Sequence, residues 1–165
     1  MDLRYTFSNR HPLVYLVLKG RLELAELIAF FEHVLTHRSF SPGTAVLLDA
    51  RNCSTSDLKH GQLLRLGEAS SALARTNGMR RCAWVSRRDV DFGVARMFEC
   101  LTEKHRSYTF RAFRGMAAAC RWLQRPTDRQ ASSASEENGF FEPGNVRLCC
   151  RFGAPRLDAS SRRCE

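Results

Sequence analysis

The chain has 165 residues, 44% of them hydrophobic, which is enough for one packed domain followed by a tail. Its net charge of +9 falls entirely before Pro126, and because the arginines alternate with apolar residues and no nucleic-acid-binding motif occurs, we expect no nucleic-acid partner. No apolar run is long enough for a membrane span or a signal peptide, so we expect a cytoplasmic protein.

The first half of the chain predicts a hairpin, a helix and a buried strand. Leu3–Ser8 and Leu13–Leu18 are strand candidates, and the second is apolar on both faces, as in a strand inside a sheet. From Leu24 to Leu35 apolar residues recur at helical spacing. Ala45–Asp49 is another short buried strand, and the loop Ala50–Thr55 follows it.

The second half alternates helices and strands. Ser56-Asp57 is a plausible cap for a helix that runs to about Thr76, whose small inner residues, including Gly67, predict close approach to the sheet. A strand from Arg81 to Ser86 comes next. It is followed by a helix capped by Asp89 or Asp91, a strand over Tyr108–Phe113 and a helix that begins at Gly115.

The resulting order, β-β-α-β-α-β-α-β-α, predicts an α/β fold with a mostly parallel sheet of four to five strands covered by about four helices. We assign residues 1–125 to this domain. The segment 126–165 is polar and rich in turn residues, so we expect a low-complexity, disordered tail. Within it, Val146–Phe152 is the alternative site of a short docked strand.

Several strings in residues 3–125 resemble the bacterial STAS-like (SpoIIAA-like) proteins, a family grouped at a distance with the CRAL-TRIO-like lipid carriers. The most specific is Phe92-Gly93-Val-Ala-Arg96-Met-Phe-Glu, and Leu48-Asp49 and the run from Phe113 to Leu123 add to it. The resemblance implies a non-enzymatic module of the anti-sigma-factor-antagonist type. Such modules dock on a kinase, and phosphorylation of a serine breaks the docking.

The loop before the second predicted helix departs from the family pattern. Regulatory members have Asp-Ser-Ser-Gly there, whereas this chain has Ser54-Thr55-Ser56-Asp57 and lacks the glycine. Ser56 lies closest to the modified position. Ser54, Thr55 and Ser56 are therefore candidates for phosphorylation and docking, and the alternative is that Ser56 is a helix cap among solvated neighbours.

A second candidate site follows from the parallel sheet, because ligands of open α/β sheets bind beyond the carboxyl ends of the strands. The loops there carry side chains and amides that suit an anion or a partner: Arg51, Arg87, Arg88, Gly93 and Arg114. The alternative is that Asp89 and Asp91 pair with these arginines. For Arg96 we expect a structural role, holding a carboxylate such as Asp49.

The remaining candidates favour no catalytic or metal chemistry. His33 and His37 are one helical turn apart, but the Glu of the zinc-protease motif is missing, so we expect no metal site. The seven cysteines form no Cys-x-x-Cys pair and are expected to be reduced thiols. No nucleophile elbow, phosphate loop or dinucleotide motif occurs, so we predict neither catalytic residues nor a cofactor.

The sequence thus predicts a non-enzymatic protein-interaction or regulatory module, with an unidentified protein partner and possible control by phosphorylation. The alternative is a carrier or sensor of a lipid or another small anionic hydrophobic ligand, which the distant CRAL-TRIO kinship and the basic domain suggest. Neither the partner nor the oligomeric state follows from the sequence.

Overall fold

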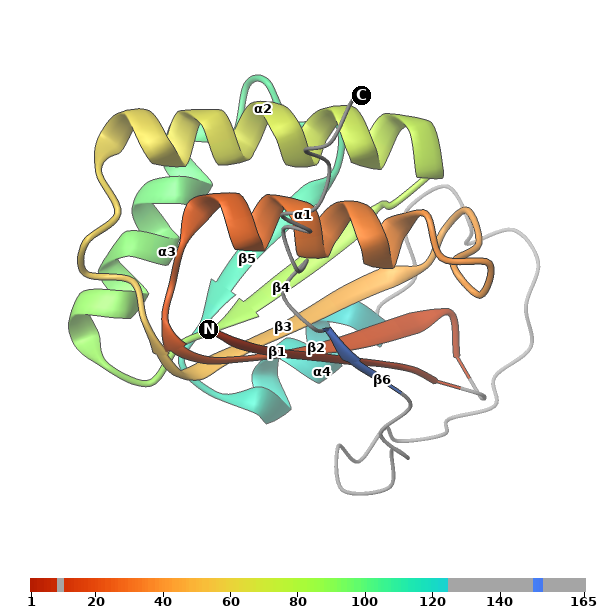
Figure 1. The fold of residues 1–165 in the computed structure, drawn as a ribbon, viewed down its shortest axis with the longest axis horizontal. Coiled ribbons are helices and arrows are strands. Elements are labelled where there is room, and N and C mark those ends of the chain that lie inside the picture. The colour runs from red at the N-terminus through yellow and green to blue at the C-terminus, as the bar shows by residue number, and fades with distance from the viewer. Residues whose placement is uncertain (9–10, 125–149, 153–165) are drawn as a thin grey trace, which may run out of the picture.

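The computed structural model describes residues 1–8, 11–124 and 150–152, the last three by their backbone. Along these ranges a hairpin is followed by alternating helices and strands (Figure 1). The elements are β1 (Asp2–Phe7), β2 (Leu13–Arg21), α1 (Leu24–Leu35), β3 (Ala45–Ser54), α2 (His60–Asn77), β4 (Arg81–Val85), α3 (Asp89–Thr102), β5 (Thr109–Phe113), α4 (Met116–Gln124) and β6 (Cys150–Phe152).

The strands form one mixed sheet in the order β5-β4-β3-β2-β1-β6. Neighbours from β2 to β5 pair in parallel, whereas β1 is antiparallel to β2 and β6 is antiparallel to β1. The predicted α/β class, the element order and the largely parallel sheet are confirmed, and β6 is an additional strand.

β6 falls in the segment for which the sequence left a docked strand open as the alternative to disorder. Its register places Cys150 opposite Tyr5 and Phe152 opposite Leu3. At these three residues the docked strand is the observed form. The rest of the predicted tail lies outside the described residues.

Helices cover both faces of the sheet: α1, α2 and α3 lie on one face and α4 on the other (Figure 1). Alternate residues of a strand point to opposite faces, so Leu48 packs into the cluster under the three helices and Leu47 into the cluster under α4. Burial on both faces explains why the central strands are apolar without alternation.

β3 continues five residues beyond its predicted end, because its pairing with β2 resumes after an irregularity between Val17 and Lys19. Arg51 therefore lies in a strand, not in a loop. The extension also displaces the start of the next helix, which is His60, and the predicted capping role of Ser56 is wrong. At the observed start, the N–H of Lys59 donates to the side-chain oxygen of Gln62 at 2.9 Å.

Candidate functional site

The connections that follow β3, β4 and β5 lie together at one edge of the sheet, which we call the carboxyl-terminal rim (residues 54–59, 86–91 and 114–115). Two kinds of contact join them. The N–H of Ser86 donates to the carbonyl oxygen of Phe113 at 3.0 Å, and Thr55 bonds to Asp91. Ser56, Arg87 and Arg114 come from these three connections and share this rim.

Asp91 holds the rim together from a buried position. One of its carboxylate oxygens accepts hydrogen bonds from the Thr55 backbone N–H at 2.7 Å and from the Thr55 hydroxyl at 2.9 Å. The other is 3.2 Å from Nε of Arg88. Both Asp91 and Thr55 are 1% exposed. Asp91 is thus a latch between the β3 connection and α3 and not the predicted helix cap, a position that Arg88 occupies.

The three candidate hydroxyl residues differ in access. Thr55 is buried with its hydroxyl committed to Asp91, which makes it a poor phosphorylation site. Ser56 is exposed in a turn that Leu58 closes by donating its N–H to the carbonyl oxygen of Thr55 at 3.1 Å. The Ser54 hydroxyl, on a half-buried residue, lies 3.2 Å from that of Ser56.

Three of the four arginines predicted for an anion-binding edge have carboxylate partners inside the chain. Arg51 pairs with Asp49, Arg88 with Asp91 and Arg114 with Asp89. The alternative of pairing with Asp89 and Asp91 thus describes Arg88 and Arg114, whereas Arg51 pairs with a carboxylate of its own strand. All three have less charge to offer to an external anion. Arg87 is exposed and forms no ion pair among the described residues.

The family string occupies the first turns of α3. Phe92 is half-buried, and the guanidinium of Arg114 lies 4.4 Å from the centre of its ring, a cation–π contact. Gly93 is exposed on the outer side of the helix. Arg96 pairs with Glu99 at 2.6 Å, and Glu99 also accepts the N–H of Ala112 at 3.0 Å.

Arg96 therefore has the expected structural role, but the carboxylate with which it pairs is that of Glu99. The suggested partner, Asp49, was wrong for a geometric reason. Asp49 is on the sheet face that α4 covers, whereas α3 packs on the opposite face. By accepting the Ala112 N–H, Glu99 also satisfies a backbone donor of the edge strand β5.

Sequence reasoning missed a polar cluster on the α4 side of the sheet. The Tyr15 hydroxyl donates to Asp49 at 2.7 Å, and Arg51 donates to both Asp49 oxygens, from Nε and Nη2, at 2.9 Å each. Burial opposes ionisation of Asp49, but the hydrogen bonds from Arg51 and Tyr15 outweigh it and lower its pKa. Burial, followed by the bond to Asp49, raises the pKa of Tyr15.

We expect Asp49→Asn to be less stable than the wild type at neutral pH, with a gap that narrows in acid. The folded-state pKa of Asp49 lies below its unfolded value, so the unfolded chain binds more protons and stability rises with pH. This contribution is complete above the unfolded pKa of about 4 and is lost as the pH falls below it. Urea unfolding at several pH values measures the difference in the free energy of unfolding between the two proteins. A difference that does not change with pH would contradict the lowered pKa of Asp49.

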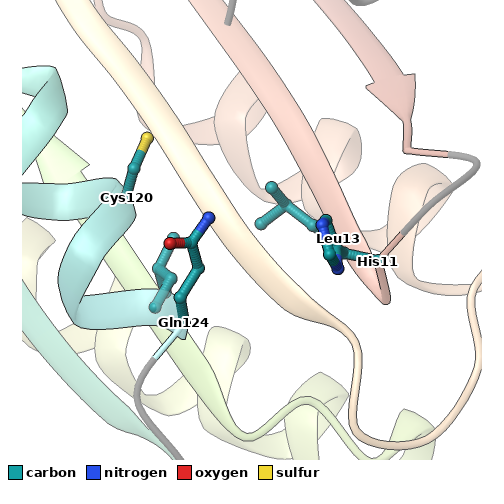
Figure 2. A pocket seen from close by; sticks show the side chains of 5 residues that line it. His11, Leu13, Cys120 and Gln124 are labelled. Carbon is teal, nitrogen blue, oxygen red and sulfur yellow. The ribbon is translucent and has the colours of Figure 1, made fainter. Parts of the chain in front are cut away.

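A small pocket lies at the other end of the sheet, between the start of β2 and α4 (Figure 2). It has a volume of about 40 Å³ and is lined by His11, Leu13, Cys120, Leu123 and Gln124. Its lining is almost wholly apolar, and burial raises the pKa of the Cys120 thiol, which therefore stays protonated at neutral pH.

His33 in α1 and His37, which follows the end of that helix and so is not on it as expected, pack against aromatic side chains of β1. Nε2 of His33 lies 3.1 Å from the Tyr5 hydroxyl, and the ring of His37 stacks on that of Phe7 at 5.0 Å. In the part of the chain that the structure describes, no group of three His, Cys, Asp or Glu side chains is arranged to hold a metal. No helix of this part is both long and apolar enough to cross a membrane.

Comparison with known proteins gives a structural similarity and no sequence match. No family model matches the sequence, and no curated protein matches it. The chain is similar to the crystal structure of an uncharacterized protein of the DUF3478 family with a SpoIIAA-like fold, from Shewanella loihica PV-4. The match has 16% identity and a TM-score of 0.45, and covers 74% of this chain and 95% of that one.

Proposed function

We propose that this chain is a non-enzymatic protein-interaction or regulatory module of the anti-sigma-factor-antagonist type, and that its partner docks on the carboxyl-terminal rim. The observation that supports this most is the buried latch between Thr55 and Asp91. It fixes the β3 connection against α3 while Ser56 and Arg87 remain exposed beside it. A preorganised frame that presents exposed polar groups suits docking, since little ordering is needed on binding.

The groups at the rim are engaged in ways that suit a binding surface better than a catalytic centre. A nucleophilic serine needs a base within hydrogen-bond reach. The neighbour of the Ser56 hydroxyl is the hydroxyl of Ser54, at 3.2 Å. At the rim, Asp89 and Asp91 each contact an arginine side chain, so their carboxylates are engaged within the chain.

Ser56 is the position at which we propose regulation. Because α2 begins at His60, a phosphate on Ser56 would stand in an exposed turn and not on the helix cap. Its neighbour Asp57 already pairs with Arg21 at 2.9 Å, so the added charge of nearly −2 would meet a carboxylate beside it. We therefore propose that phosphorylation changes the charge of the docking surface without melting the fold.

The rim can be tested by measuring capture of the partner from an extract of the source organism on immobilised protein. We expect Ser56→Asp and Arg87→Glu each to weaken capture about tenfold, which corresponds to about 1.4 kcal/mol. Arg38→Glu is the matched control, since Arg38 is exposed in the connection that precedes β3, whereas the rim follows the carboxyl ends of the strands. If both rim variants bind as the wild type does, the rim is not the docking surface.

The pocket between β2 and α4 gives the carrier alternative no support. Pockets for small molecules usually hold about 300 Å³ or more, whereas the pocket between β2 and α4 holds about 40 Å³. Native mass spectrometry of protein purified from its own host separates the two proposals. A stoichiometric lipid adduct would favour the carrier, and a bare protein that retains a protein partner would favour the module.

A further inference from the structure

The outer side of α3 carries an apolar stripe that starts in the rim and continues beyond it. Val90 is 55% exposed and Met97 38%, and these are the exposed large hydrophobic side chains among the described residues. They are seven positions apart, so they lie on the same side of the helix two turns from each other. Single exposed apolar residues are ordinary, but two on one helix face form a local patch.

Gly93 makes a notch in this stripe. It lies one turn after Val90 and one turn before Met97 and is exposed. A Cβ built on Gly93 would meet nothing within 4 Å, so the space beside its backbone is open. A glycine in a helix interior costs about 1 kcal/mol relative to alanine, and it also lets a second helix approach closely.

The stripe is complementary to itself when two copies of α3 run antiparallel. With a two-fold axis at the level of Ala95, Met97 of each copy lies over Gly93 of the other. The same axis places Val90 opposite Cys100, and it brings Arg87, two residues before α3, towards the end of the second helix, which Glu103 follows. Arg87 and Glu103 are both exposed, and neither forms an ion pair among the described residues. A single two-fold axis thus places the Met97 side chain in the space beside Gly93. It also brings together two charged residues that have no ion-pair partner among the described residues.

We propose that this chain self-associates as a two-fold dimer through the outer face of α3, with a second copy of the chain as the occupant. The interface is isologous, as in most homodimers. A single helix pair is a small interface, so the dimer is a reversible one. Arg87 and Val90 belong both to the rim and to this interface, so Gly93 and Met97, which lie outside the rim, are the positions that separate dimerisation from partner docking.

Sedimentation velocity of the full chain over a range of concentrations is the first test. We expect a monomer–dimer equilibrium in which Met97→Asp and Gly93→Leu each raise the dissociation constant about tenfold or more. Gly61→Leu is the matched control, because Gly61 is also an exposed helical glycine with nothing within 4 Å of an added Cβ. Equal Tm values for the wild type and the variants, measured at concentrations at which each is monomeric, would show that the substitutions preserve the fold.

Charge exchange tests the axis itself. Arg87→Glu and Glu103→Arg are each expected to weaken the dimer, and the double variant is expected to restore it. Val90→Cys is expected to form a disulfide with Cys100 of the second copy when oxidised glutathione accepts the two electrons, and mass spectrometry identifies the linked peptides. A chain that stays monomeric at all concentrations, or a dimer that Met97→Asp and the charge exchange leave unchanged, would overturn the proposal.

Discussion

Replacing Asp91 with alanine is expected to lower the free energy of unfolding by about 3 kcal/mol. The substitution leaves the Thr55 N–H and hydroxyl without an acceptor at a position that is 1% exposed. A buried donor that loses its partner costs about 1–3 kcal/mol, and bonds to a charged group lie at the upper end of that range. For a chain of this length the expected fall in Tm is about 6 to 12 °C, measurable by calorimetry.

Two control variants separate the latch from the surface charge pair. Thr55→Val keeps the shape and the backbone bond but loses one donor, so we expect a loss of about 1 kcal/mol. Arg88→Ala removes a side chain that is 58% exposed, and we expect a loss below about 1 kcal/mol. If Asp91→Ala costs no more than Arg88→Ala, the carboxylate does not hold the β3 connection in place.

The latch also connects stability to the proposed function. Asp91→Ala would free the connection between β3 and α2, which contains Ser56, from α3. We therefore expect this variant to weaken partner capture even though Asp91 itself is buried. Because Thr55→Val keeps the backbone bond, its capture is expected to stay close to that of the wild type.

The order of the elements could be predicted from the sequence because each element has its own period. The helical repeat of α1 and the continuous apolar strands β2 to β4 are local signals, and their alternation implies a parallel sheet. The end of β3 and the start of α2 were predicted wrongly because pairing with β2, not local composition, decides where β3 ends. Residues 50–54 look like a loop in isolation and are a strand only beside β2.

The position of the candidate site at the rim could be predicted from the sequence, but the carboxylate that pairs with each arginine could not. Parallel strands bring their following loops to one end of the sheet, so the meeting of the three connections that carry Ser56, Arg87 and Arg114 follows from topology. Which carboxylate each arginine meets depends on sheet faces and side-chain directions. The cluster of Tyr15 and Asp49 carries no local signal, because its members are 34 residues apart and meet only across paired strands.

Gly67→Ala is expected to destabilise the protein by about 2 kcal/mol, although alanine favours a helix more than glycine by about 1 kcal/mol. The small residues of α2 predicted close approach to the sheet, but the close neighbour of Gly67 is α3. A Cβ on Gly67 would overlap Cγ2 of Thr102 and lie 3.1 Å from its Cβ. Thr102 is 3% exposed and bound through its hydroxyl to the carbonyl oxygen of Phe98 at 2.7 Å, so it has little room to move.

The origin of this loss can be tested within the same helix. Thr102→Ser removes the overlapping methyl group and keeps the hydroxyl, so in combination with Gly67→Ala it is expected to recover most of the lost stability, as measured by urea unfolding. Gly61→Ala, where an added Cβ meets open space, is expected to be neutral or slightly stabilising. The same substitution at these two positions of α2 should thus have different effects on stability, because helix propensity acts at both positions and contact with α3 acts at Gly67. Equal effects at the two positions, or no recovery with Thr102→Ser, would show that α2 and α3 are not in close contact there.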